Sequence, residues 1–190
     1  IPYAIPSFVS ALVWQGMLNQ RFGIINELLN ADIAWLRDPT LAKVSILLVN
    51  MWLTFPYMFL ISTGALQAIP SELQEAARVD GAKSSQVFRR VTFPLLMVTL
   101  GPLLIASFAF AFNNFIIIYY LTGGDPPIAG AQTPAGHTDI LISYTFGLAF
   151  ETGRGADFGL AAAIASMIFI MVATVSAISF RRTAALEELT

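Results

Sequence analysis

Four long stretches of this 190-residue chain carry no charged residue, and they limit its possible folds more than any other feature. They cover residues 1–20, 44–71, 91–124 and 158–180. Because about 20 helical residues cross the roughly 30 Å hydrocarbon core of a bilayer, each stretch is long enough to span a membrane. We therefore expect an all-α membrane protein with about four transmembrane helices, near residues 1–18, 41–66, 93–121 and 158–180.

The composition agrees with a membrane location. Hydrophobic residues make up 56% of the chain and charged residues only 12%, which leaves too little polar surface for a soluble globule. A net charge of −2 offers no basic stripe for nucleic acid, and the absence of cysteine excludes disulfide and thiolate chemistry. The chain starts with Ile and lacks a basic leader, so we expect it to belong to a longer polypeptide with at least one earlier span.

The segments between the expected spans differ in character. Apolar residues within 19–39 are spaced for one helical face, which predicts an amphipathic helix at the membrane interface with Trp35 at headgroup depth. Residues 70–94 form a charge-rich block, and residues 122–157 form a Gly-rich loop region.

The basic residues orient the expected spans. Six lie on one side of the membrane: Arg78, Lys83, Arg89, Arg90, Arg181 and Arg182. Four lie on the other: Arg21, Arg37, Lys43 and Arg154. Because the cytoplasmic side carries the excess of Lys and Arg, the 70–94 block is predicted to be cytoplasmic and the 122–157 region periplasmic.

The cytoplasmic block has a helical pattern of its own. Ser71 stands three residues before Gln74, a capping-box spacing that predicts a helix start after Pro70. Gly81 is placed to end this helix. A second helix then leads through Phe88 to the next span, so the block is predicted to be two short helices at an angle.

Within this block, Glu75-Ala76-Ala77, followed after three intervening residues by Gly81 and then by a hydrophobic residue and Pro94, resembles the EAA loop of bacterial ABC importer permeases. The similarity also includes residues 1–8, 134–139 and 157–165, covers nearly the whole chain, and is to permeases of the maltose and maltodextrin type. It implies a single permease domain over 1–190 with the MetI-like fold, in the bacterial inner membrane. The alternative is that 70–94 is only a solvated loop.

The resemblance also implies partners. In this family the EAA loop docks in a cleft of a separate ATPase, a second permease completes the channel, and a periplasmic binding protein delivers the sugar. The chain itself is then not an enzyme, needs no cofactor, and leaves ATP to the ATPase. The residues at the ATPase contact would be Glu75, Ala76, Asp80, Gly81 and Phe88.

Polar residues inside the expected spans indicate a substrate path, because they are costly in hydrocarbon. On the second span, Asn50, Leu53, Thr54 and Tyr57 share one face, and on the third span Ser107, Phe110, Ala111 and Asn114 repeat that spacing. Amides, hydroxyls and aromatic rings suit a carbohydrate. The alternative is that the asparagines only join packed helices.

By resemblance, six of these residues match sugar contacts of the family: Asn50, Leu53, Tyr57, Ser107, Phe110 and Asn114. Two positions depart, because Thr54 replaces a glycine and Ala111 replaces an asparagine that bonds the sugar. The exact sugar is therefore open.

Other functions find less support in the sequence. No phosphate-binding glycine loop is present, so the chain is not the ATPase. A transporter driven by an ion gradient should carry titratable residues inside its spans, and the four stretches have none. His137 lacks neighbouring ligands, so we expect no metal or catalytic site. A membrane scaffold without transport activity is the remaining alternative.

Overall fold

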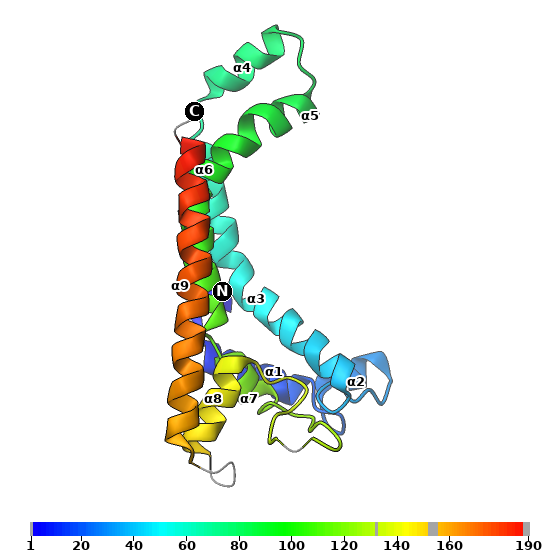
Figure 1. Cartoon of the computed structure of the whole chain (residues 1–190). Coiled ribbons are helices and arrows are strands. Elements are labelled where there is room, and N and C mark those ends of the chain that lie inside the picture. Colours follow the sequence, from blue (N-terminus) through cyan, green and yellow to red (C-terminus); the bar gives the residue numbers. More distant parts are fainter. Residues whose placement is uncertain (1, 132, 152–155, 188–190) are drawn as a thin grey trace. The chain divides into compact units, whose positions relative to one another are not determined.

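The computed structural model describes residues 2–131, 133–151 and 156–187, with backbone only for 182–187. Its regular elements are helices (Figure 1): η1 (Pro2–Ala4), α1 (Ser7–Met17), α2 (Ile24–Leu29), α3 (Pro39–Gln67), α4 (Ser71–Val79), α5 (Ser84–Val87), η2 (Phe88–Thr92), α6 (Phe93–Phe112), α7 (Ile116–Leu121), α8 (Leu141–Phe150) and α9 (Phe158–Glu187). They form two compact units. The first comprises Ile1–Pro56 and Asn113–Ile170, and the second comprises Tyr57–Phe112 and Met171–Thr190.

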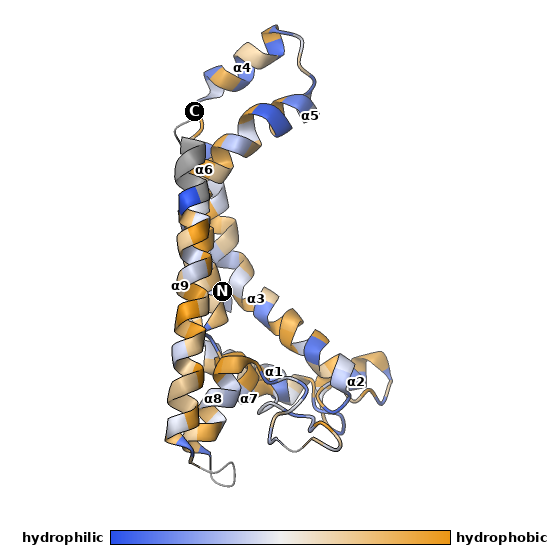
Figure 2. Cartoon of the chain, in the orientation of Figure 1, coloured by the Kyte–Doolittle hydropathy of each residue, from blue (hydrophilic) through white to orange (hydrophobic). Residues whose placement is uncertain are grey.

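Three helices are long and apolar enough to cross a membrane: Pro39–Gln67, Ser84–Phe112 and Phe158–Arg181. Hydrophobic residues predominate along α3, α6 and α9, and Figure 2 shows this for α3 and α9. These helices confirm the second and fourth predicted spans.

The first predicted span, over 1–18, is wrong for the described residues. Pro6 stands at the N-cap of α1, which has only 11 residues. At 1.5 Å per residue such a helix is about 16 Å long, roughly half the hydrocarbon thickness. Instead α1 packs against α7 in the first unit.

The third predicted span, over 93–121, is broken near its end. Helix α6 stops at Phe112, and α7 starts again at Ile116. Asn114 Oδ1 accepts a hydrogen bond from Ile116 N at 3.1 Å, so the asparagine side chain satisfies a free amide at the start of α7. The observed span starts earlier than predicted, because the helix runs continuously from Ser84 to Phe112.

The core of the first unit joins α1, α3 and α7. It consists of buried Leu18, Val49, Leu53, Ile117 and Leu121. Partly buried residues pack around this cluster, among them Trp14, Trp35 and Leu36. This packing holds the short helices α1 and α7, which neither length nor composition would stabilise alone.

The predicted interfacial helix over 19–39 is much shorter, because only α2 is helical there. Asn30 ends α2 in the left-handed conformation, with φ 48°. Asn26, only 6% exposed, donates to Gln20 O and Ile33 O and accepts from Trp35 Nε1 at 2.8 Å. This hub folds the segment back on itself, and it ties the Trp35 indole into the packing of the unit.

Hydrogen bonds also fasten the loop before α8. The Thr138 hydroxyl contacts that of Thr122 at 2.8 Å and donates to Asp125 O at 2.7 Å. The Asp139 carboxylate accepts from Gly136 N and from the Ser143 hydroxyl. The loop is thereby fixed to the ends of both α7 and α8.

Candidate functional site

Helix α4 carries the predicted ATPase contact, and it starts as predicted at Ser71. The capping box is wrong, however, because Pro70 occupies the N-cap and no side-chain cap forms. Ser71 is already helical. Instead, the negative charge of Glu72 in the first turn and the positive charge of Arg78 in the last turn stabilise the helix through its dipole.

Gly81 ends α4 in a Schellman motif, which confirms its predicted role. Ala82 N donates to Ala77 O, and Gly81 N donates to Arg78 O, each at 3.0 Å. The Gly81 φ of 84° lies in the left-handed region, which glycine adopts without the Cβ penalty of other residues. The turn reverses the chain sharply into α5.

The return arm begins with a second cap and contains a π-helical turn. Lys83 N donates to Gln86 Oε1 at 2.8 Å. The π turn, η2, ends at Thr92, two residues before Pro94. The proline ring would clash with the carbonyl four residues earlier, at Arg90, and a wider turn relieves this clash. We call residues 71–92 the elbow.

Between its two arms the elbow has an open pocket of about 330 Å³, lined by Ala77, Asp80, Gly81, Ala82, Gln86, Val87, Arg90 and Val91. Val87 is buried at its inner corner. Small side chains on α4 leave this space open, so the elbow presents a concave side as well as a protruding tip.

The five predicted coupling residues are all exposed: Glu75, Ala76, Asp80, Gly81 and Phe88. Phe88 is 51% exposed and its ring lies 6.1 Å from that of Phe93. Sequence reasoning missed Val79, which is 87% exposed. A large apolar residue at the end of a charge-rich helix is the signal that could have identified it, because an exposed apolar side chain suits a protein contact.

The predicted sugar residues are divided between the two units. In the first unit, Asn50 is half-buried, whereas Leu53 is 8% exposed and belongs to the core. The Thr54 hydroxyl donates to Asn50 O at 2.8 Å. Asn114 is also in the first unit, near the α7 residue Ile117 that packs with Leu53.

In the second unit, Tyr57 and Ser107 are half-buried, and Phe110 is 72% exposed. Ser107 and Phe110 lie on α6, three residues apart. The helical face predicted for the third span does not extend to Asn114, because α6 ends at Phe112. The predicted common face is therefore wrong for Asn114, which lies between α6 and α7 and accepts a hydrogen bond from Ile116 N.

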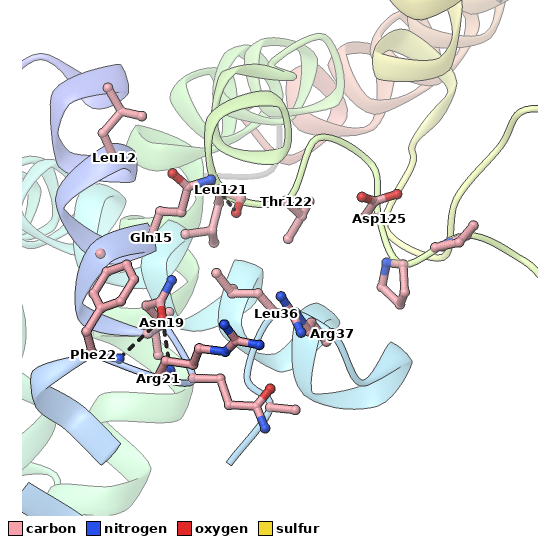
Figure 3. A pocket seen from close by; sticks show the side chains of 16 residues that line it. Leu12, Gln15, Asn19, Arg21, Phe22, Leu36, Arg37, Leu121, Thr122 and Asp125 are labelled. Carbon is pink, nitrogen blue, oxygen red and sulfur yellow. Dashed lines mark hydrogen bonds between the residues drawn. The ribbon is translucent and has the colours of Figure 1, made fainter. Parts of the chain in front are cut away.

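Sequence reasoning did not find a cavity of about 810 Å³, which both polar and apolar side chains line (Figure 3). It lies within the first unit, between α1, residues 34–37 and residues 121–127. Its polar lining includes Gln15, Asn19, Arg21, Arg37 and Asp125. The recurrence of basic residues before and after α2 was the available signal, but only folding shows that they share a cavity.

Comparison with known proteins identifies a family and several relatives. Residues 1–187 match the binding-protein-dependent transport system inner membrane component. The chain is 51% identical over 187 residues to the maltose/maltodextrin transport system permease protein MalF of Vibrio vulnificus (strain YJ016), and 50% identical to that of Escherichia coli (strain K12). Each match covers 96% of this chain and 36% of the relative. The chain thus spans about a third of the length of these curated relatives.

Two solved structures share the fold. A bacterial ABC transporter involved in the import of the acidic polysaccharide alginate has a TM-score of 0.71 at 18% identity, covering 97% of this chain and 62% of that chain. The alginate transporter in complex with an alginate pentasaccharide-bound periplasmic protein has a TM-score of 0.69 at 21% identity, covering 96% and 60%. The predicted ABC importer permease fold is confirmed.

The relatives are permease subunits of transporters, and the three apolar helices are those of a multi-pass inner membrane protein. The chain therefore belongs to the family of binding-protein-dependent transport system inner membrane components.

Proposed function

We propose that this chain forms the core of the permease of an ATP-driven importer for maltose and maltodextrins. The observation that carries this proposal is the 51% identity to MalF, which extends over 96% of the chain. The predicted substrate residues lie within this matched length. The exposed elbow supports an ATP-driven rather than an ion-driven mechanism, because a channel coupled to a separate motor needs a contact surface outside the membrane.

The elbow is the proposed contact with the ATPase. Ala76 allows close approach to a partner, Glu75 offers a carboxylate, and Val79 adds apolar surface. Residues 70–94 are then cytoplasmic, residues 122–157 are periplasmic, and ATP is bound by the partner chain alone. This chain would require no cofactor of its own.

Two further partners follow from the same proposal. Large side chains on the spans are exposed, including Phe59 at 67% and Phe169 at 72%, which suits contact with a second permease and with lipid. A periplasmic sugar-binding protein would deliver the substrate. The solved alginate transporter in complex with its periplasmic protein supports such an arrangement by similarity of fold.

Six residues are the proposed sugar contacts: Asn50, Leu53, Tyr57, Ser107, Phe110 and Asn114. Half-buried amide and hydroxyl groups can pair with sugar hydroxyls, and exposed Phe110 can cover an apolar sugar face. Leu53 would need to leave the core to contact sugar, so it is expected to act mainly by shaping the packing around Asn50.

The test uses the full-length permease assembled with its second permease and ATPase in proteoliposomes. Replacement Glu75→Ala should lower maltodextrin-stimulated ATP hydrolysis at least tenfold while assembly survives. Glu72→Ala is the matched control, because both carboxylates are exposed on the same helix. Equal loss in the two variants, or none in either, would contradict the proposed coupling role.

A permease for a different sugar is the second candidate, and it is favoured by Ala111. This side chain is exposed on α6, so an amide could be accommodated there. If maltose is the substrate, Ala111→Asn should lower the KM for maltose. If another sugar stimulates ATP hydrolysis more strongly than maltodextrins in the unmodified importer, the mechanism stands and the substrate assignment fails.

A further inference from the structure

The 810 Å³ cavity of the first unit contains two arginines that sequence order keeps apart. Arg21 follows α1, and Arg37 lies two residues before α3. The Asn26 hub folds the intervening segment, so that both residues line one space. In Figure 3 both guanidinium groups reach into the cavity.

These guanidinium groups form no ion pair within the part of the chain that the structure describes. Figure 3 marks hydrogen bonds to Arg21 only at its backbone amide, where Asn19 Oδ1 accepts at 3.0 Å. Because that oxygen also accepts from Phe22 N, the Asn19 Nδ2 group is oriented away as a further donor. The lining therefore brings together donors for an anion.

The charge of the lining also favours an anion. The lining of this cavity carries two arginines and one carboxylate, that of Asp125. Glu27 and Asp32 line an adjoining pocket that Arg21 also borders, but neither forms an ion pair with it among the described residues. A guanidinium matches the oxygens of a phosphate with paired N–H donors. A neutral sugar would satisfy the amides of the lining but would not neutralise the arginines.

The position of the cavity along the chain indicates the source of the phosphate. Arg37 lies two residues before Pro39, where a helix long and apolar enough to span a membrane begins, and lipid headgroups surround the ends of such spans. Apolar side chains are exposed beside the arginines, with Phe22 76% and Leu12 45% exposed, and both line the cavity. They provide a surface for hydrocarbon next to the site for phosphate.

We propose that Arg21 and Arg37 bind the headgroup phosphate of an anionic phospholipid at the periplasmic end of the spans. Asn19 supplies the additional donor, and the lipid chain lies along Leu12 and Phe22. The bound lipid neutralises the arginine pair and thereby stabilises the fold of residues 19–38 against α1. This role is separate from the sugar transported and from the elbow.

The test counts retained lipids on the full-length permease in its assembled importer. Nanodiscs contain either phosphatidylglycerol mixed with phosphatidylcholine, or phosphatidylcholine alone with inorganic phosphate added. The importer is then released from the nanodiscs, and native mass spectrometry reports the lipid that stays bound to it. The unmodified importer should retain phosphatidylglycerol, and Arg21→Gln with Arg37→Gln should weaken this retention roughly tenfold or more, since each removes a charged hydrogen bond.

Two variants make the result specific. Arg181→Gln removes an exposed arginine that does not line the cavity, and it should retain the lipid. Arg37→Lys keeps the charge without the paired donors, so its lipid retention should fall between that of the unmodified importer and that of the double variant. Arg37→Lys also replaces the double variant in the test if the latter fails to assemble. Equal retention in Arg37→Lys, the double variant and the unmodified importer would overturn the proposal. So would equal loss in Arg181→Gln, or binding of inorganic phosphate without retention of phosphatidylglycerol.

Discussion

Replacement of Gly81 by alanine tests whether the elbow depends on one left-handed residue. The Gly81 φ is 84°, and a side chain in that conformation costs about 1–2 kcal/mol. An added Cβ would meet nothing within 4 Å, so no steric clash adds to this cost. Because alanine also restricts the unfolded chain, which offsets part of this cost, the net destabilisation is about 1 kcal/mol.

This destabilisation should increase opening of the elbow roughly fivefold. Hydrogen exchange in the assembled importer measures it through the amides of Gly81 and Ala82, which bond to carbonyls of α4. In Gly81→Ala, exchange of the 81–82 amides should accelerate by that factor. In Gly81→Asn the acceleration should be smaller, because asparagine tolerates the left-handed region better than alanine.

Gly64→Ala is the matched control, since its Cβ would also meet nothing within 4 Å but its backbone is helical. Alanine there should preserve exchange rates in the elbow and support α3. If Gly81→Ala exchanges as slowly as Gly64→Ala, the elbow does not rely on the left-handed cap, and the reasoning is refuted.

Three further changes test the first unit. Asn26→Ala removes the partner of Trp35 Nε1 at a site only 6% exposed, so it should lower the free energy of unfolding by about 2–4 kcal/mol in a denaturant titration. Gly136→Ala would place a Cβ against the Gly124 carbonyl oxygen, and proteolysis should show the 122–140 loop cut faster than in the unmodified permease. Asn114→Asp keeps an acceptor for the cap of α7, so thermal unfolding should be unchanged. If Asn114 contacts sugar, that variant should nevertheless raise the KM for maltodextrin, whereas an unchanged KM would favour a capping role alone.

The elbow was largely predictable because its signals are local. The position of Pro70, the left-handed residue Gly81 and the charges of α4 act within a few residues of one another. Even there, the predicted side-chain cap at Ser71 was wrong, because Pro70 took the cap position. Spacing alone does not distinguish a residue that caps a helix from the first residue within it.

The substrate face was less predictable, because helical spacing was assumed to continue through the paired asparagines at 113–114. Helix α6 ends just before them, and the Asn114 side chain serves the next helix. Leu53 has the spacing of a path residue, yet its contacts with α7 bury it. Whether a polar face lines a path depends on partners that are far away in sequence.

The sequence by itself determined the all-α membrane class, the second and fourth spans, the charged elbow and the family to which the chain belongs. These follow from hydrophobic length, local turn chemistry and residue identity. Only the tertiary structure decided that α1 is a short packed helix, that Leu53 is buried and that Arg21 and Arg37 share a cavity. The physical reason is that burial and the meeting of distant side chains depend on non-local packing, which no short stretch of sequence encodes.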